Sequence, residues 1–418
     1  MVDIMNVNTS ILENFKIYDK ALSRLDAKEK KVLISLKMMY SIHMENIQAD
    51  KNLFFLFKQL IRFVLKLITV PFYKVKVSNN AKTSKCAIIK SSKTEEYMAS
   101  KVGATLISTK KCFSLNMKSA DVYKRLFRSV YLLFRQTELN KAYCLALSHR
   151  LVDYLMVYHT IDLGEIKVVM MENDRMPVNM ALIHLAKERG VKTVKYDNWL
   201  IDPVNHNDVY CEYYFYPSLY HKEIVQSFES NRELKFVEGG FAYWDNLDLY
   251  EKIKNTHTKK IVYFTQIGIS VQEHLSYIDD IAQTINKLGL SYELIVKTHP
   301  RENTQSYKEL SVRYRVVDGH DDIYALIAEA DYCFSIFSTV SLEAKHILNN
   351  SFFINYRKED FGHINYNDLG LDLIGNNDDL LRLFKGDLLP VSQDIFISRG
   401  NCSYPYTAEK LRKVFCDG

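Results

Sequence analysis

The sequence predicts an α/β protein made of two consecutive units, each a parallel sheet covered by helices. Short apolar segments alternate with segments of helical periodicity from about residue 85 onward. The alternation stops at the polar stretch 251–260 and starts again at residue 261. A chain of 418 residues also exceeds what one ordinary core supports, so two domains are expected.

The first eighty residues differ from the rest and are predicted to be helical. The segment Leu53–Thr69 is almost wholly apolar or aromatic apart from Lys58, Arg62 and Lys66. These three recur at every fourth position, so they share one stripe of a helix. Three charges in so short a segment argue against a helix that crosses a membrane.

Two interpretations of this helix remain open. From Lys51 to Lys90 the chain has Lys and Arg residues but no Asp or Glu, which favours a helix lying in the surface of an anionic membrane. The alternative is a helix buried at an interface between domains or subunits, with its lysines reaching outward to water.

The first unit contains one helix with clear boundary signals. Pro177–Arg189 has a proline in its first turn and Gly190 directly after its last residue, which are the usual start and stop signals of a helix. Short apolar segments on both sides of it are expected to pair in parallel. The predicted strands are Cys86–Ile89, Ala104–Ile107, Tyr143–Leu147, Lys167–Met171, Val191–Lys195 and Tyr213–Tyr216.

The second unit repeats the alternation of strands and helices. Its predicted strands are Ile261–Gln266, Tyr292–Lys297, Tyr314–Val317, Tyr332–Phe337 and Phe352–Tyr356, and its predicted helices are Glu273–Leu288, Ile323–Glu329 and Val340–Leu348. A last helical stretch, 408–415, is placed so that it can return to the first unit. We therefore divide the chain into a helical segment 1–80, a first unit 81–255 and a second unit 256–418.

Hydroxyl side chains follow one strand of the second unit at the start of a helix. Ser335, Ser338 and Thr339 lie there, and Ser338 or Thr339 is a natural N-cap. The start of a helix offers unpaired N–H groups and a positive dipole end, both of which attract phosphate. Glu343, one turn into the helix, can accept hydrogen bonds from ribose hydroxyls. Ordinary capping is the alternative explanation for all of these residues.

A second polar loop follows the strand that ends at Lys297. The proline of the pair His299–Pro300 keeps the histidine extended and ends the strand, so the imidazole is expected to face the cleft above the sheet edge. It can donate a proton or a hydrogen bond to a phosphate, with Lys297 or Arg301 adding positive charge. A structural loop histidine is the common alternative. Because carboxyl ends of parallel strands meet at one edge, both loops together favour a phosphate-bearing ligand.

A third loop, which follows the first strand of the second unit, contains Thr265, Gln266 and Gly268. Its small and polar residues allow the backbone to approach a ligand. The loop has neither a glycine-rich dinucleotide fingerprint nor a Walker pattern.

Group transfer from a nucleotide donor needs a base for the acceptor hydroxyl, and we expect the first unit to supply it. The loop carboxylates there are Glu172, Asp174, Asp197 and Asp202. Asp197 directly follows a strand and is the first choice, and Asp174 is the second. N-capping and turn formation are the alternative roles. No metal is expected, because the histidines His206, His221, His274 and His320 lack metal-ligand spacing.

Composition limits the setting in which the chain works. The formal charge of +5 is too mild to imply nucleic acid. The seven cysteines are scattered, which fits a reducing cytosol better than a disulfide framework. The N-terminus lacks the basic flank and apolar run of a signal peptide.

The Lys-x-His-Pro strand exit at Lys297–Pro300 and the later helix start at Ser338–Thr339 resemble those of GT-B glycosyltransferases of bacterial surface polysaccharides. The likeness is to sialyl-, polysialyl- and Kdo-transferases, and more distantly to the polyglycerol-phosphate transferases of teichoic acid synthesis, over roughly residues 165–350. It implies two Rossmann-like domains that face a cleft, with the acceptor on the first domain and the nucleotide-sugar donor on the second.

The resemblance also implies roles for individual residues. His299, Ser338 and Thr339 would bind the donor phosphate. An acidic-acidic-glycine motif supplies the base in such enzymes, but the corresponding strand exit here, Tyr196–Asn198, has one acid and no glycine. Many of these enzymes associate with the inner face of the cytoplasmic membrane, which agrees with the basic helix.

The expected activity is inverting, metal-independent glycosyl transfer without a cofactor, from a CMP-linked acidic sugar such as sialic acid or Kdo to a glycan or glycolipid acceptor. Two alternatives stay open. One is a CDP-polyol phosphotransferase of the teichoic-acid type. The other is a non-catalytic polysaccharide-assembly protein that has kept the fold. Fold analogy alone does not choose among them.

Overall fold

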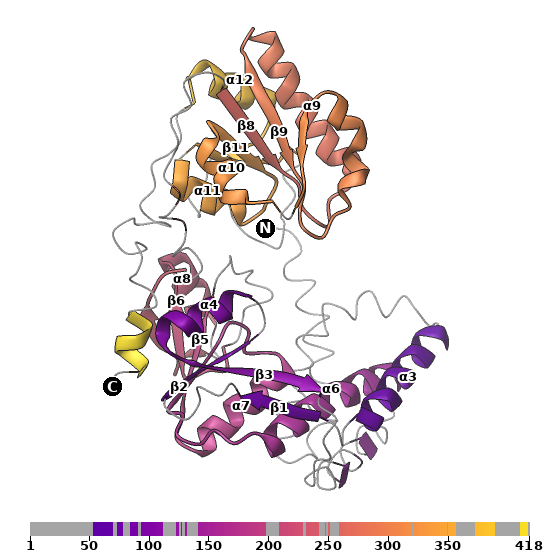
Figure 1. Cartoon of the computed structure of the whole chain (residues 1–418), viewed down its shortest axis with the longest axis vertical. Helices are drawn as coiled ribbons and strands as arrows, with labels where there is room; N and C mark the ends of the chain where they lie inside the picture. Colours follow the sequence, from indigo (N-terminus) through magenta and orange to yellow (C-terminus); the bar gives the residue numbers. More distant parts are fainter. Residues whose placement is uncertain are drawn as a thin grey trace.

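The structure is a computed structural model of the chain (Figure 1). It describes residues 53–69, 73–77, 84–90, 93–111, 123–124, 127, 130–131, 141–197, 209–228, 231–241, 247, 250, 259–319, 321–348, 350–356, 373–388 and 410–416. Asn198, Trp199, Asp202, His206, His320 and most of the segment 1–80 lie outside these residues.

The first sheet has the strand order β1-β3-β2-β4-β5-β6-β7 and is parallel except for its edge strand β1, which pairs antiparallel with β3. Its strands are β1 (Tyr73–Val77), β2 (Cys86–Ile89), β3 (Thr105–Lys111), β4 (Val168–Met171), β5 (Lys192–Tyr196), β6 (Tyr213–Tyr216) and β7 (Lys235–Glu238). The helices described with it are α3 (Leu53–Thr69), α4 (Lys93–Val102), α6 (Lys141–Thr160), α7 (Pro177–Glu188) and α8 (Leu219–Gln226).

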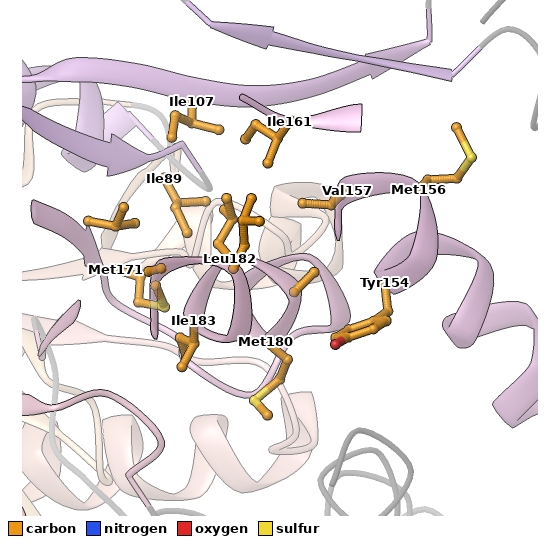
Figure 2. Close-up of a cluster of buried hydrophobic side chains, with 14 of the residues drawn as sticks. Ile89, Ile107, Tyr154, Met156, Val157, Ile161, Met171, Met180, Leu182 and Ile183 are labelled. Atoms are coloured by element: carbon orange, nitrogen blue, oxygen red, sulfur yellow. The ribbon is translucent and has the colours of Figure 1, made fainter. Parts of the chain in front are cut away.

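Both faces of the first sheet are covered. Ile89 of β2 packs on the side of α6 and α7, where Figure 2 shows it near Leu182. Ile88, the neighbouring residue, packs on the opposite side against Met98 of α4 and Phe415 of the C-terminal helical turn η7 (Arg412–Cys416). Successive strand residues therefore enter different cores, as in a sheet wound on both faces.

The second sheet has the order β10-β9-β8-β11-β12-β13, and every pair in it is parallel. Its strands are β8 (Lys259–Phe264), β9 (Tyr292–Lys297), β10 (Arg315–Val317), β11 (Tyr332–Ser335), β12 (Ser351–Ile354) and β13 (Leu373–Ile374). Its helices are α9 (Val271–Lys287), the 3₁₀ segment η5 (Thr304–Val312), α10 (Ile323–Glu329), α11 (Val340–Leu348) and α12 (Asn377–Lys385).

This sheet is also wound on both faces. Tyr263 of β8 lies in one core with Ile281 of α9, whereas Val262 lies in the other with Ile327 of α10 and Ala344 of α11. The chain therefore has two Rossmann-like α/β units, which Figure 1 shows as two separate groups of strands. This GT-B-like fold class is the one that the sequence predicts.

Residues between the two sheets join the units. Phe241 and Leu247, which follow β7, share an apolar cluster with Leu342 of α11. Tyr250 packs on Tyr324 of α10 with 5.4 Å between the ring centroids. The domain boundaries proposed above remain predictions, but these contacts show that the connecting segment packs on the second unit.

Two elements of the first unit differ from the prediction. The prediction of a strand at Tyr143–Leu147 is wrong, because these residues lie inside the long helix α6 (Lys141–Thr160). Buried residues of that helix, Leu145, Ser148 and Leu151, follow at intervals of three, which is a helical spacing. Strand β1 was not predicted, and it falls in the range expected to be helical.

The helix α3 was predicted, and its basic residues differ in exposure. Lys66 turns toward α6 and forms a 2.6 Å ion pair with Asp153, whereas Arg62 is exposed. Five apolar residues are exposed as well: Leu60, Ile61, Val64, Leu65 and Ile68 are 43–61% exposed. Within the described residues, no helix is both long and apolar enough to cross a membrane.

The cysteines also depart from the expectation. Cys86 takes part in a disulfide, whereas Cys211 and Cys333 are buried and not in disulfides. One disulfide departs from the reducing setting that the scattered cysteines favour, but it does not make a disulfide framework.

Candidate active site

The candidate site lies at one edge of the second sheet, where β9, β8 and β11 end side by side. The His299 loop follows β9, the Thr265 loop follows β8 and the Ser338 loop follows β11. Adjacent strands are about 4.8 Å apart, so the two outer loops start about 10 Å from each other. The residues that the sequence predicts for the donor thus belong to one edge.

Thr265 joins the loops after β8 and β9. Its backbone N–H donates to the carbonyl of Lys297 at 3.0 Å, and its Oγ1 accepts from the N–H of His299 at 3.0 Å. The same hydroxyl donates to Oε2 of Glu302. Thr265 is buried, so the hydroxyl serves to hold the His299 loop in place.

Gln266 joins the loops after β8 and β11. Its Oε1 accepts from the N–H of Phe337 at 3.0 Å, which fixes which end of the amide is the oxygen. The other end, Nε2, is buried and has no partner in the structure. The Gln266 side chain, only 4% exposed, therefore carries an unused donor pair beside the start of α11.

The ring of His299 has a defined tautomer. Its Nδ1 accepts from the N–H of Arg301 at 3.1 Å, so in the neutral ring the proton lies on Nε2. Burial is the main cause that lowers the pKa of His299, and Glu302 opposes it. A half-exposed neutral imidazole with a free Nε2–H can donate to an anion.

Pro300 is exposed, and the backbone beside it meets Gly319 after β10. A Cβ on Gly319 would lie 2.6 Å from the N and Cα of Pro300 and 2.7 Å from the carbonyl carbon of His299. Only glycine fits there, because real Cβ atoms do not approach backbone so closely.

Two predicted donor residues point into the protein. Lys297 is buried, and its ammonium group donates to the carbonyl of Asp318; burial lowers its pKa. Ser335 is buried, with its hydroxyl 2.6 Å from that of Ser341. It also accepts from the N–H of Ser338 at 3.3 Å. Both residues shape the loops from below.

The start of α11 presents Ser338 and Thr339, both partly exposed. The Oγ of Ser338 accepts from the N–H of Val340 at 3.4 Å. Glu343 lies one turn further and is nearly buried, and this burial raises its pKa to about 7. A side-chain hydrogen bond with Tyr324 acts in the opposite direction.

Gly268 lies in the loop between β8 and α9 and has a φ of 89°, a left-handed conformation that favours glycine. It is exposed, as is Ile267 beside it. Ser270 then caps α9 by accepting from the N–H of Glu273 at 3.2 Å. The loop therefore leaves an open surface next to Gln266.

In the first unit, Asp197 lies at the end of β5 in a buried ion pair. Lys195 donates to both carboxylate oxygens, at 2.7 and 2.9 Å. The hydroxyl of Tyr214 donates to Oδ2 at 2.5 Å. Burial, and then Asp197, raise the pKa of Tyr214. Both oxygens of this carboxylate are therefore engaged by protein partners.

Asp174 follows β4 and is held differently. Its Oδ2 accepts from the N–H of Tyr210 at 2.6 Å, whereas its buried Oδ1 has no partner. Burial raises the pKa of Asp174, and the nearby Lys195 and Arg175 oppose the rise. Of the two predicted bases, Asp174 has the unused acceptor.

Other polar residues of the two units have structural contacts. The Nδ1 of His221 lies 2.7 Å from the Oγ of Ser218, the cap of α8. The Nδ1 of His274 lies 2.9 Å from the hydroxyl of Tyr263, and its ring is buried. Among the described residues, no group of three or more His, Cys, Asp or Glu side chains is placed to hold a metal ion.

Two residues at this edge were not predicted. Glu302 accepts hydrogen bonds from both neighbouring loops, and Gly319 supports the His299–Pro300 backbone. A carboxylate three residues after the histidine is a spacing at which a turn can close, but the sequence alone does not show that it does.

No family model and no curated relative matches the sequence. Among solved structures, the chain is similar to a putative UDP-N-acetylglucosamine 2-epimerase from Listeria monocytogenes, with 12% identity, 78% of this chain and 94% of that chain covered, and a TM-score of 0.46. It is similar to UDP-GlcNAc 2-epimerase from Neisseria meningitidis, with 13% identity, 79% and 97% covered, and a TM-score of 0.44. It is also similar to the wall teichoic acid polymerase TagF, with 13% identity, 91% and 96% covered, and a TM-score of 0.41.

Proposed function

We propose that the chain is an inverting glycosyltransferase whose nucleotide-sugar donor binds at the edge formed by β9, β8 and β11. The observation that carries this proposal is a pair of hydrogen bonds: the N–H of His299 donates to Thr265, and the N–H of Phe337 donates to Gln266. They join three strand exits into one surface that offers an imidazole N–H, an amide, hydroxyls and a helix start.

This surface has the chemistry to stabilise a leaving phosphate. The Nε2–H of His299 and the hydroxyls of Ser338 and Thr339 are neutral donors, and the start of α11 adds a positive dipole end. Donors fixed in advance stabilise charge that develops in the transition state without reorganising. Glu343, further along α11, is suited to ribose hydroxyls.

We propose Asp174, rather than Asp197, as the base. The acceptor oxygen attacks the anomeric carbon, the bond from that carbon to the phosphate oxygen breaks, and the acceptor proton moves to Oδ1 of Asp174. Its oxygen without a protein partner, and the burial that raises its pKa, both favour acceptance of a proton. Asp197 is already engaged by Lys195 and Tyr214.

A CMP-linked acidic sugar is the preferred donor, because its single phosphate can be bound by the neutral donors of the loops, whereas Lys297 donates to the carbonyl of Asp318. The second candidate is a CDP-polyol phosphotransferase, which the same phosphate-facing loops favour. It would attack phosphorus and form a phosphodiester in place of a glycosidic bond. A non-catalytic assembly protein would bind the nucleotide without turning it over.

The acceptor side includes an anionic membrane surface, which α3 contacts. The support is the row of exposed apolar residues on α3, together with a chain segment, 51–90, that has basic but no acidic residues. A glycolipid acceptor would then be presented from that surface.

The proposal is tested by ligand stabilisation followed by product analysis. In a panel of CMP, CDP, UDP and GDP, we expect a cytidine nucleotide to raise the melting temperature most. With the matching donor, a glycosidic product supports glycosyl transfer and a phosphodiester supports the second candidate. Nucleotide binding without transfer or hydrolysis supports the assembly protein. His299→Ala should lower turnover about 100-fold with an unchanged fold, and near-normal turnover would contradict the role of His299.

A further inference from the structure

We propose that Glu302 is a positioning residue that fixes the imidazole of His299 at the site edge by gathering three hydrogen-bond donors from the surrounding loops. This inference rests on the proposed function, because it assigns the group through which His299 acts. Glu302 is partly buried beneath the loop and is distinct from the residues expected to touch the donor.

The three donors come from different elements. The N–H of His299 donates to Oε2 of Glu302 at 3.2 Å, and the hydroxyl of Thr265, at the end of β8, donates to the same oxygen. The hydroxyl of Tyr307, in η5, donates to Oε1 at 2.8 Å. One carboxylate therefore connects the loops after β8 and β9 with η5.

Two further hydrogen bonds close the loop that contains His299 and Glu302. The N–H of Glu302 donates to the carbonyl of His299 at 2.9 Å, and the N–H of Arg301 donates to the ring Nδ1 of His299 at 3.1 Å. The backbone turn and the ring are thus fixed together. With Nδ1 occupied, the proton of the neutral ring is on Nε2, the atom available to a ligand.

A carboxylate suits this position. All three partners donate to it, and an ionised carboxylate accepts only. An amide of the same shape would turn an N–H₂ group toward one of them, so that a hydroxyl partner would have to accept instead of donate, and the negative charge would be lost. Tyr307 is 1% exposed and has no access to water as a substitute partner.

The charge of Glu302 also acts on the ring. Burial lowers the pKa of His299, Glu302 raises it, and the positive charges of Arg301 and Lys297 lower it. Removing the negative charge leaves only the lowering influences. The ring should then titrate at lower pH.

The test uses the full chain with Glu302→Gln, and Glu309→Gln as the control, since Glu309 is exposed in the same segment η5. NMR of histidine labelled at Cε1 follows the titration of His299, which His299→Ala assigns. We expect Glu302→Gln to shift that titration to lower pH, to lower kcat about 100-fold and to change KM for the donor less than about 3-fold. The control should match the wild type.

A merely structural role predicts another pattern: a lower melting temperature with an unchanged His299 titration, and this result overturns the proposal. If Glu302→Gln does not fold, amide hydrogen exchange of the wild type tests the hydrogen bonds on which the positioning depends, in which Thr265 and Glu302 share the N–H of His299. The N–H of His299 should exchange at least about 10-fold more slowly than an unprotected amide; unprotected exchange overturns the proposal.

The titration and the exchange rate are read without any ligand. They therefore test the positioning of His299 even if no nucleotide binds and the proposed function fails. Conversely, a nucleotide that binds while Glu302→Gln leaves both the titration and kcat unchanged contradicts only the positioning role.

Discussion

Gln266 and Phe337 are 71 residues apart in sequence, yet the backbone N–H of Phe337 donates to Oε1 of Gln266 at 3.0 Å. The bond attaches the loop before α11 to the end of β8. It also turns the Nε2 of Gln266 toward a position with no protein partner. A buried amide nitrogen without a partner is costly, so a ligand acceptor at this position would remove the cost.

Gln266→Ala should therefore weaken binding of the preferred nucleotide. Losing one hydrogen bond to an anionic ligand costs about 1.5 kcal/mol, or about tenfold in Kd. Calorimetric titration measures the change. Gln305→Ala is the matched control, because Gln305 is exposed in η5. Equal affinities for the two variants would remove Gln266 from the site.

Gly319→Ala should displace the His299–Pro300 backbone. The added Cβ would lie 2.6 Å from Pro300, so the loop must move by a substantial part of an ångström. Misplacement of that size lowers kcat about 100-fold. Gly375→Ala is the control in the same unit, since its Cβ would have its nearest neighbour at an ordinary 3.6 Å. The two variants are compared by steady-state kinetics, and similar kcat values would show that the loop position is not critical.

Substitution of Asp174 and substitution of Asp197 should have different effects on turnover and stability. Asp174→Asn should lower kcat at least about 100-fold while the free energy of unfolding stays near that of the wild type. Asp197→Asn leaves Lys195 buried without its charged partner and should cost about 3–5 kcal/mol of unfolding free energy. Urea unfolding and turnover measure both quantities. The reverse assignment, with Asp197 controlling turnover at unchanged stability, would restore Asp197 as the base.

The raised pKa of Glu343 should make the free energy of unfolding depend on pH. Its pKa is raised from 4.5 to about 7 in the folded state, so it binds a proton more tightly when folded. Its contribution is fully present below pH 4.5 and is lost as pH rises through 7, by at most about 3 kcal/mol. Glu343→Gln should remove this slope in urea unfolding between pH 4.5 and 7.5. An identical slope in both proteins would show that Glu343 is not the group responsible.

The apolar face of α3 should bind vesicles that contain anionic lipid. Replacing Leu65 and Ile68 together by Glu adds charge where 57% and 61% of the two residues are exposed, and should abolish cosedimentation with such vesicles. Val312→Glu, at a position 87% exposed in η5, is the control. If the double variant instead converts a dimer to a monomer, and the wild type does not bind vesicles, α3 is a subunit interface.

Much of the second unit could be predicted from sequence. Tyr292–Lys297, Ile323–Glu329 and Val340–Leu348 have the bounds of β9, α10 and α11, because each apolar segment is bounded by turn or capping residues. Parallel pairing then places their loops at one edge. The edge itself therefore follows from the order of elements, without knowledge of any side-chain contact.

The direction of individual side chains was harder to predict. Ser335 shares a sheet face with Cys333, and Lys297 shares one with Ile295; both of these partners lie in the core under α10 and α11. The two polar residues were expected to contact the ligand, but for this reason they lie beneath the loops. Strand alternation could have shown this.

Contacts made only after folding lie beyond sequence reasoning. Lys195 lies two residues before Asp197, on the same face of β5, so strand alternation could have suggested that pair. The contact with Tyr214 of β6 depends on the register of two strands, which the sequence leaves undefined. The same holds for Glu302 and Gly319, whose importance depends on a turn geometry that many sequences could adopt.

The central claim is that the loops at the edge formed by β9, β8 and β11 bind the phosphate of a nucleotide donor. Calorimetric titration of CMP and CDP into the wild type and into a variant with both Ser338→Ala and Thr339→Ala tests it most directly. The account predicts saturable binding to the wild type and at least about tenfold weaker binding to the variant. Binding of equal strength to both proteins, or no binding of any nucleotide to the wild type, would contradict it.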